Sequence, residues 1–329
     1  MTDFTGRQLD SYRIDTLVGQ SSVGAVYRAI DLKQGRPVRL TVVDRALVPD
    51  PSVRQCFQQQ IELAIRLAHP AIVKVLDHGE NEDRVYFVTE PETAHKLGAV
   101  LERISSRGHV IQLDETLYLM AQVADALVLA HRHGCIHGHL QPDNILLERL
   151  ARGENKPAQE TFQGSLQARV TGFGLNSLVN THWLDNQVEA LPYLSPEQCM
   201  GQEAGDRSDI YALGAILYTL ATGRPPLSVA SAAEANRPTH DCGEKPPAPQ
   251  EVHPGLPATV AAIIHKAMAR QPGERFRTVD QMLYALRQAR ALLTETTQER
   301  FSPPDKTTSL VAHLLTTAMD DTAAEDVIQ

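Results

Sequence analysis

The hydrophobic pattern of this chain changes character once, near Pro91. Before that point, short apolar segments with strand-like spacing follow one another, and a single helical segment interrupts them. The strand-like segments are Tyr12–Val18, Val23–Ile30, Val38–Asp44, Ile72–Asp77 and Val85–Glu90. The first part of the chain is therefore predicted to form a five-stranded antiparallel sheet that buries one face against its helix.

Four segments carry apolar residues at the spacing of an α-helix. The first, Ser52–Leu67, interrupts the strand-like segments. The three that follow Pro91 are Asp114–His133, Ile210–Thr222 and Thr278–Leu293. Because Ile210–Thr222 is apolar on almost every side, we expect it to lie at the centre of a mostly helical second unit.

The charge balance argues against two classes of partner. The 329 residues include 31 Lys and Arg against 40 Asp and Glu, a net charge of -9, so we expect no binding to nucleic acid or to an anionic membrane. The longest apolar run, Ile210–Ala221, is shorter than the ~18 residues that span a bilayer. Because residues 1–10 do not have the pattern of a signal peptide, the predicted location is cytoplasmic.

The four cysteines are far apart in the sequence. Cys56, Cys135, Cys199 and Cys242 include no Cys-x-x-Cys pair, so neither a disulfide framework nor a zinc site is indicated. All four are predicted to be reduced thiols.

Five short motifs occur in a fixed order along the chain. They are Val18–Tyr27 (VGQSSVGAVY), His137–Leu146 (HGHLQPDNIL), Thr171–Gly174 (TGFG), Ser195–Glu197 (SPE) and Ser208–Gly214 (SDIYALG). In this order and at this spacing, the chain from Tyr12 to about Leu293 resembles a bacterial, eukaryotic-like Ser/Thr protein kinase domain.

The resemblance implies an α+β, bilobal protein kinase-like fold. Its N-lobe would be the five-stranded antiparallel sheet with one main helix, and its C-lobe would be mostly helical. The predicted limits are 12–90 for the N-lobe and 91–294 for the C-lobe, with a polar insertion at 148–167. Residues 1–11 would form an N-terminal extension, and residues 295–329 a Thr-rich acidic tail.

The chain departs from the family pattern where that pattern is charged. Protein kinases rely on a lysine in the third strand, its glutamate partner on the helix, a carboxylate base and metal-binding groups. The residues that stand at these positions are Thr41 for the strand lysine, Gln60 for the glutamate, His139 for the base, Gln141 for the lysine after it and Gly172 for the metal-binding aspartate. The resemblance therefore implies that the chain has no catalytic residues.

The resemblance also places a nucleotide pocket between the lobes, in a degenerate form. Its positions are Gly19, Ser21, Gly24, Val26, Arg39, Thr89, Glu92, Asn144 and Leu146. Arg39 replaces a small residue and shares a strand face with Thr41, so we expect its guanidinium to occupy the pocket, the alternative being that it bends out to solvent. Asn144 alone remains of the family's metal ligands, and Mg²⁺ normally takes at least one carboxylate. The prediction is no metal site, no cofactor, and absent or weak binding of ATP and Mg²⁺.

By contrast, the positions that hold the kinase fold together are retained. They are His137, Phe173, Gly174, Glu197, Asp209 and Arg275, and the resemblance implies that Glu197 pairs with Arg275. Because only the charged catalytic positions are lost, we predict a pseudokinase and not an enzyme. It would act as a signalling scaffold or allosteric regulator through protein contacts. The alternative is a divergent kinase-fold enzyme with residual or atypical nucleotide binding and group transfer, in which Arg39 would face the phosphates.

The predicted partners are signalling proteins. They include an active Ser/Thr kinase or a protein with a forkhead-associated domain, because such domains bind phosphothreonine. Thr317 and Thr322 each have an acidic residue three places later and are candidate phosphorylation sites. The alternative is that Leu310–Met319 docks on the C-lobe as a short helix. A metal site among the clustered histidines is disfavoured, because the resemblance assigns His131 and His137 to the framework.

Overall fold

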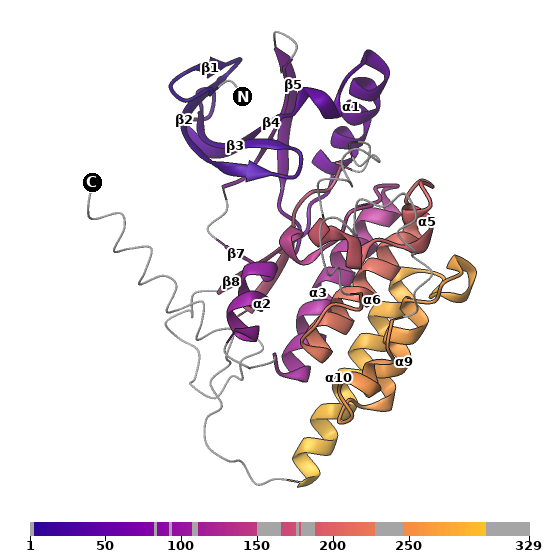
Figure 1. The fold of residues 1–329 in the computed structure, drawn as a ribbon. Coiled ribbons are helices and arrows are strands. Elements are labelled where there is room, and N and C mark those ends of the chain that lie inside the picture. Colours follow the sequence, from indigo (N-terminus) through magenta and orange to yellow (C-terminus); the bar gives the residue numbers. More distant parts are fainter. Residues whose placement is uncertain are drawn as a thin grey trace.

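The computed structural model describes residues 3–81, 84–91, 94–106, 111–149, 166–175, 178, 188–227 and 246–300, with side chains as far as 294. These residues form two lobes, a curled sheet with one helix and a bundle of helices beneath it (Figure 1). The predicted bilobal α+β fold is confirmed. The limits 12–90 and 91–294 for the lobes stay predictions.

The N-lobe sheet has six antiparallel strands among the described residues, in the order β1-β2-β3-β4-β6-β5. They are β1 (Gln8–Leu9), β2 (Tyr12–Ser21), β3 (Gly24–Asp31), β4 (Arg36–Val43), β5 (Val75–Asn81) and β6 (Arg84–Thr89). The prediction of five strands lacked β1, which is too short to show an alternating pattern. β5 begins at Val75, three residues after the predicted start, and Ile72 instead makes an isolated bridge to Val170.

The N-lobe helix α1 (Pro51–Ile65) forms where the sequence predicted it. Asp50 caps it by accepting hydrogen bonds from the backbone N–H groups of Ser52 and Val53. Its buried residues, Phe57, Ile61 and Ala64, recur at helical spacing and pack into the larger of two hydrophobic clusters. The apolar stripe therefore fixes which face of α1 meets the sheet.

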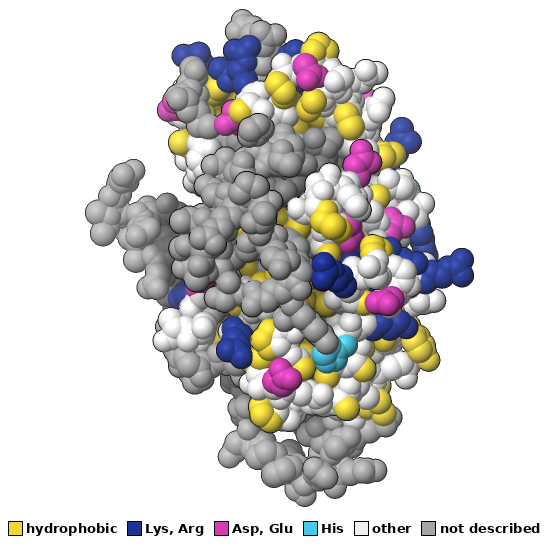
Figure 2. Space-filling view, turned by 45° about the vertical axis from the view of Figure 1, so that its right-hand side comes forward, with side chains coloured by type: hydrophobic (Ala, Val, Ile, Leu, Met, Phe, Trp, Pro, Cys, Tyr) yellow, Lys and Arg dark blue, Asp and Glu magenta, His cyan; other side chains and the backbone are white. Residues whose placement is uncertain are grey.

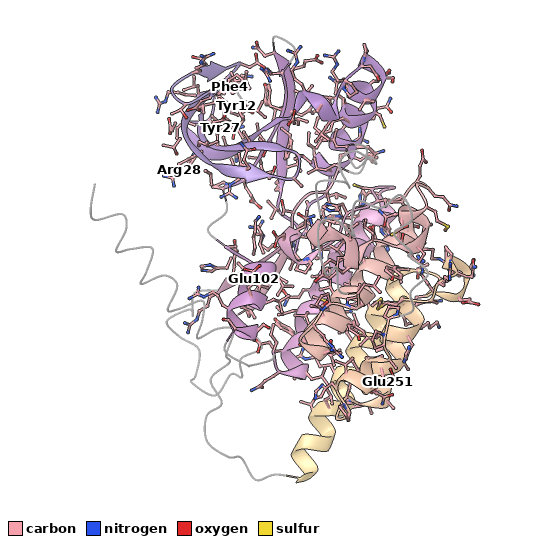
Figure 3. All side chains as sticks on the ribbon, in the orientation of Figure 1. Phe4, Tyr12, Tyr27, Arg28, Glu102 and Glu251 are labelled. Carbon is pink, nitrogen blue, oxygen red and sulfur yellow. The ribbon has the colours of Figure 1, made fainter. Side chains whose placement is uncertain are left out.

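The smaller cluster covers one face of the N-lobe sheet. Figure 3 shows Phe4, Tyr12 and Tyr27 within the curl of β1 to β3, and the rings of Phe4 and Tyr27 meet edge to face at 6.2 Å. Alternate residues of β4, among them Leu40, belong to this cluster. The side chains between them point to the opposite face of the sheet, toward the C-lobe.

The C-lobe is a bundle built around α6. Its helices are α2 (Leu97–Ser105), α3 (Leu113–Arg132), α5 (Pro196–Cys199), α6 (Asp206–Thr222), α8 (Pro249–Val252), α9 (Ala258–Ala267) and α10 (Val279–Arg300). It also has short 3₁₀ turns at η2 (Pro142–Asn144), η5 (Val188–Tyr193) and η6 (Pro272–Glu274), whereas η1 (Arg45–Leu47) belongs to the N-lobe. Every residue of α6 from Ser208 to Ala221 is buried, as the apolar sequence predicted. α10 continues to Arg300, into the segment predicted to be a tail.

A second sheet lies where the lobes join. It consists of β7 (His95–Lys96), β8 (Ile145–Arg149) and β9 (Leu166–Val170), in that order. The segment 148–167, predicted as a loop, begins and ends in paired strands, with Glu148 opposite Gln167. Residues 150–165 lie outside the described residues. Arg169 on β9 joins Glu90, at the end of β6, to Glu148 on β8 through two ion pairs.

The surface carries charges of both signs. On the face shown in Figure 2, basic and acidic side chains are interspersed among the described residues. No helix among these residues combines the length and apolar character needed to cross a membrane.

The cysteines differ in state. Cys56 and Cys135 are free, but Cys199 is disulfide-bonded, so the prediction of four reduced thiols is wrong for Cys199. Cysteine spacing along the chain detects local pairs and gave no signal for this bond.

Candidate functional site

A cavity of about 520 Å³ separates the N-lobe sheet from the C-lobe, and we call it the interlobe cavity. It is lined by the turn between β2 and β3, by β4 and β6, and by the loops around Asn144 and Gly172. Most positions predicted for the nucleotide pocket line it: Gly19, Ser21, Val26, Arg39, Thr89, Asn144 and Leu146. The degenerate positions Thr41, Gln141 and Gly172 line it too.

Arg39 and Thr41 enter the cavity from β4. They alternate with Leu40, which is fully buried on the opposite face of the sheet, so the strand periodicity alone sends both side chains toward the C-lobe. Arg39 lies opposite Thr89 on β6, and Thr41 lies opposite Phe87. A guanidinium therefore lines the cavity two residues before the position at which the family has its lysine.

The turn between β2 and β3 is closed by its own serine. Ser21 Oγ donates a hydrogen bond to the backbone oxygen of Gly24 at 2.9 Å. A Cβ on Gly24 would overlap the backbone oxygen of Val42 on β4, which explains why a glycine stands there. Gly24 packs against β4 and is not among the residues that line the interlobe cavity.

His139, at the position of the family's base, does not line the cavity. Its side chain is buried, and burial, with the neighbouring His137, lowers the pKa of His139 to about 3. Asn144 Nδ2 donates to the backbone oxygen of His139 at 2.7 Å, and Asn144 itself lines the cavity. His139 is thus a neutral, packed residue and not an acceptor of protons from the cavity.

The loop after β9 supplies space where the family has a carboxylate. Gly172 has a φ of +91°, and a Cβ there would lie 3.6 Å from His137 Nε2 and 3.8 Å from Asn144 Cγ. His137 Nε2 lies 2.9 Å from the backbone oxygen of Thr171, and its ring packs edge to face on Phe173 at 4.9 Å. Gly174 then brings the loop against α1, where a Cβ would lie 3.0 Å from the backbone oxygen of Gln60.

Asp209 on α6 holds the start of the loop at residues 137–144, which we call the catalytic loop after its place in the kinase pattern. It accepts hydrogen bonds from the backbone N–H groups of His137 at 2.9 Å and Gly138 at 2.8 Å, and it lies 2.7 Å from His131 Nε2. Burial alone would raise the pKa of Asp209, but the hydrogen bond and charge of His131 hold it below its ordinary value. Burial likewise opposes charge on His131, yet Asp209 raises its pKa above the ordinary value.

This pair predicts a pH-dependent stability. Because the pKa of His131 is raised, its contribution is complete below about pH 6.5 and is lost as the pH rises through the raised value. Because the pKa of Asp209 is lowered, its contribution is complete above about pH 3.8 and is lost as the pH falls through the lowered value. We expect His131→Gln to cost about 2 kcal/mol in urea unfolding at pH 5.5 and clearly less at pH 9.

The control for this prediction is His133→Gln. His133 is exposed at the end of α3 and lies 2.9 Å from the backbone oxygen of Leu129. The His133→Gln substitution should therefore cost little unfolding free energy at either pH. An equal loss for His131→Gln at both pH values would contradict the prediction.

Glu197 and Arg275 form a buried, two-pronged ion pair, as the resemblance implied. Arg275 Nη1 and Nη2 donate to Glu197 Oε1 and Oε2 at 2.7 Å each. The same guanidinium donates to the backbone oxygens of Ala269 and Arg207 and lies over the ring of Tyr211. This pair joins α5 to the segment before α10.

Some predicted positions lie elsewhere. Gln60 is on α1 and His139 is packed in the core, and neither is among the residues that line the cavity. Glu92, Thr317 and Thr322 lie outside the described residues. No group of three His, Cys, Asp or Glu side chains among the described residues is placed to hold a metal ion.

Sequence reasoning missed two charged residues of the cavity. Lys96, just before α2, and Asp143, in η2, both line it, and Lys96 Nζ lies 3.6 Å from Asp143 Oδ2. No local pattern could have paired them, because β7 and η2 meet only in the fold. The sequence did contain one signal for Asp143, because it directly precedes Asn144, which was predicted to line the nucleotide pocket.

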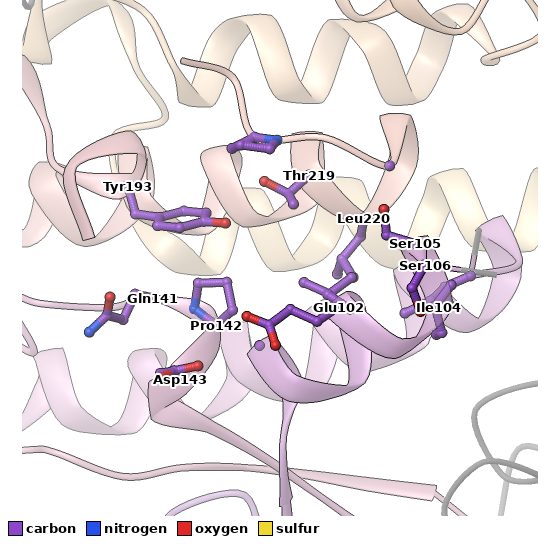
Figure 4. Close-up of a pocket in the computed structure, with 15 residues that line it drawn as sticks. Glu102, Ile104, Ser105, Ser106, Gln141, Pro142, Asp143, Tyr193, Thr219 and Leu220 are labelled. Carbon is purple, nitrogen blue, oxygen red and sulfur yellow. The ribbon is translucent and has the colours of Figure 1, made fainter. Parts of the chain in front are cut away.

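A second cavity, of about 530 Å³, adjoins the first between α2, η2 and α6, and we call it the α2 pocket. Gln141 and Asp143 line both cavities. Figure 4 shows the side chains of Glu102 and Asp143 on either side of Pro142, with Tyr193 and Thr219 across from them. The two cavities therefore meet at Asp143.

Residues 12–287 match the sequence family described as "Protein kinase domain". The chain is 30% identical, over 82% of its length, to a probable serine/threonine-protein kinase of Streptomyces coelicolor, and 31% identical, over 82% of its length, to the serine/threonine-protein kinase PrkC of Bacillus subtilis. It spans 38% and 39% of those two relatives. The crystal structure of the Mycobacterium tuberculosis PknI kinase domain superposes with a TM-score of 0.66 over 86% of this chain and 98% of that one, at 24% identity.

Two predictions about function are wrong. The relatives are named as Ser/Thr protein kinases across the matched region, which contradicts the prediction that the chain is not an enzyme. The same names contradict the prediction of no ATP and no Mg²⁺. Both predictions took the absence of charged residues at the family positions to mean that the chain has no activity. They did not take into account the other charged residues that the fold brings to the cavity, such as Lys96 and Asp143.

Proposed function

Because this chain belongs to the protein kinase domain family, we propose that it binds ATP in the interlobe cavity and transfers the γ-phosphoryl group to a hydroxyl group of another protein. The observation that carries this proposal is the cavity itself, which is lined from both lobes by most of the positions predicted for the nucleotide pocket and by two cationic side chains, Arg39 and Lys96. Phosphoryl transfer is mainly a matter of positioning and of charge stabilisation, so cations at new positions can serve it.

The cavity offers a nucleotide both an apolar and a charged part. Val18, Val26 and Leu146 line it from the two lobes, as a planar base requires. Arg39 presents a guanidinium, whose donors match phosphate oxygens in pairs. We therefore assign the binding of the phosphates to Arg39.

The residues present also fit Mg²⁺ that arrives with the nucleotide. Mg²⁺ takes phosphate oxygens and keeps several waters, and Asn144 supplies an amide oxygen at the wall of the cavity. Gly172 supplies none, so the phosphates would hold most of the ion. When bound, the ion neutralises charge that develops on the phosphates.

The rate of transfer is expected to be low. His139 is buried and neutral, so it does not replace the base carboxylate of the family. A positioned base contributes on the order of 10²- to 10⁴-fold, and its absence lowers the rate without abolishing binding. Transfer of radiolabelled phosphate from ATP measures it directly.

An Arg39→Ala variant tests the proposal. ATP at a hundred times its dissociation constant should stabilise the wild type by about 2.7 kcal/mol in a thermal unfolding experiment. We expect Arg39→Ala to weaken ATP binding about tenfold or more, because it removes a charge-assisted contact. Arg13→Ala is the matched control, since the Arg13 side chain is 58% exposed on β2. Tighter ATP binding by Arg39→Ala would mean that Arg39 fills the pocket and would contradict its role.

A protein-binding role is a second candidate. The Glu197–Arg275 ion pair holds the C-lobe together at residues outside the lining of the interlobe cavity, so a surface for a partner can persist whatever occupies the cavity. Candidate partners are an active Ser/Thr kinase or a forkhead-associated domain protein. Co-purification of the chain with an active Ser/Thr kinase, in the presence and in the absence of ATP, tests this role.

A further inference from the structure

We propose that the segment Leu310–Met319 of this chain binds as a short helix in a groove between α3 and α10 of its own C-lobe. The groove is a cavity of about 530 Å³ lined by residues between Tyr118 and Asp125 of α3 and between Arg287 and Thr294 of α10, and we call it the α3–α10 groove. Among the described residues it shares no lining with the interlobe cavity or the α2 pocket. The proposal therefore does not rest on the proposed function.

The walls of the α3–α10 groove offer apolar contacts. α10 packs along α3, as Figure 1 shows, and the groove is lined by Ala121 on α3, Ala291 on α10 and the ring of Tyr118. The amide of Gln122, also in the lining, is already used, because both its oxygen and its nitrogen make hydrogen bonds to the backbone of β9. The two alanines leave space in which the side chains of a third helix can pack.

A large aromatic side chain lies exposed beside the groove. Tyr284 on α10 is 67% exposed. Residues 284, 287 and 291 have the spacing that places them on one face of a helix. Because Arg287 and Ala291 line the groove, Tyr284 lies next to its end and extends the apolar area that a docked helix would cover. Exposed aromatic side chains in such a place are typical of a surface that contacts another segment of polypeptide.

The segment Leu310–Met319 has the apolar stripe that this groove requires. Its apolar residues recur at helical spacing, at Leu310, Val311, Leu314, Leu315 and Ala318. A helix of ten residues is about 15 Å long, which is also about the length of α10 from Tyr284 to Thr294. An isolated helix of this length is unstable in water, so it forms only where its apolar stripe is buried.

The linker is long enough for the segment to reach the groove. α10 ends at Arg300, and Thr294 in the groove lining lies about 9 Å before that end. Residues 301–309 can span up to about 30 Å when extended, and the two prolines among them do not allow α10 to continue through the linker. The chain can therefore turn back and place Leu310–Met319 antiparallel to α10.

Charge complementarity favours this antiparallel direction. Asp320 and Asp321 follow the segment directly. In the antiparallel arrangement they arrive at the end of the groove where Arg287 lies, and the opposite direction would take them toward Thr294. Arg287 is 59% exposed and lies 3.7 Å from Asp125, so its five N–H donors can serve a second carboxylate as well.

The tether favours the segment of this chain over a segment of another molecule. A short flexible linker holds its two ends at an effective concentration of about 1 mM. A contact with a dissociation constant of about 0.1 mM is then occupied about ten times as often as it is empty. A second copy of the chain at micromolar concentration would leave the same contact mostly empty.

Hydrogen exchange in the full chain measures the docking. The first four N–H groups of a helix have no partner within it, so we expect the amides of residues 314–319 to exchange about tenfold more slowly than in an unstructured chain. Ala291→Glu places a carboxylate in the groove and should remove this protection. Gln288→Glu is the matched control, because Gln288 is exposed on α10 outside the groove lining. Asp320→Asn with Asp321→Asn should reduce the protection in part.

Labelling of Tyr284 by hydroxyl radicals is a second measurement, made from the side of the groove. A docked segment covers Tyr284, so its labelling should be several-fold slower in the wild type than in Leu314→Asp, which places a charge in the apolar stripe. Thr316→Asp adds the same charge on the opposite side of the helix and should behave as the wild type does. Both substitutions lie in the segment, so this measurement stays valid if Ala291→Glu is unstable.

Three results would overturn the proposal. If the amides of residues 314–319 exchange at the unstructured rate in the wild type, the segment is not docked. If their protection rises with protein concentration, the contact is made with a second copy. If the protection survives in Ala291→Glu, or if the labelling of Tyr284 is unchanged in Leu314→Asp, the segment binds to another surface.

Discussion

An Arg275→Ala variant is expected to lose about 3–5 kcal/mol of unfolding free energy. The Arg275 residue is 3% exposed, and its removal would leave the Glu197 carboxylate buried without its two-pronged partner. Burial would raise the pKa of Glu197, and at present the hydrogen bond from Arg275 keeps it below its ordinary value. Urea unfolding at pH 7 measures the loss.

Arg287→Ala is the matched control for this prediction. Arg287 also pairs with an aspartate, Asp125, at 3.7 Å, but its side chain is 59% exposed, so the loss should stay below about 1 kcal/mol. Removing both buried charges, with Glu197→Gln and Arg275→Met, should recover part of the loss. If Arg275→Ala costs no more unfolding free energy than Arg287→Ala, the Glu197–Arg275 pair does not hold α5 to the segment before α10.

An Asp209→Ala variant is expected to lose about 3 kcal/mol or more and to loosen the catalytic loop. It leaves the buried N–H groups of His137 and Gly138 without their acceptor, and each such group costs about 1–3 kcal/mol. The loop itself starts at these residues. Faster hydrogen exchange at His137 and Gly138 should therefore accompany the loss of stability.

Asp280→Ala separates this effect from the loss of a surface charge. Asp280 pairs with Arg132 at 2.6 Å, but both side chains are about half exposed or more, at 49% and 67%. We expect a cost below about 1 kcal/mol and no change in exchange at the catalytic loop. If hydrogen exchange at His137 and Gly138 is also unchanged in Asp209→Ala, contacts other than those of Asp209 hold the loop.

Sequence patterns predicted the elements whose signals are local. The spacing of Phe57 and Ile61 predicted α1 to within two residues of its observed bounds, Pro51–Ile65. Sequence patterns could not place β1, whose two residues form a strand only because Leu9 pairs with Tyr12. Nor could they place the start of β5, since Ile72 pairs across the lobes with Val170.

The same contrast holds for the interlobe cavity. Motif spacing predicted that Gly19, Arg39 and Thr89 line it, because each stands at a fixed place in a strand or turn. Motif spacing could not show that Lys96 meets Asp143, because that contact depends on how β7 packs against η2. Judging the chemistry by the family positions alone therefore underestimated the charge that the cavity contains.

The backbone at Gly172 limits which side chains this position accepts without strain. Its φ of +91° is a conformation that side-chain-bearing residues rarely adopt, although the space beside His137 and Asn144 would hold a Cβ. Gly172→Asp would place a carboxylate beside Asn144, in space that the fold leaves open but on a backbone that carries some strain with any side chain.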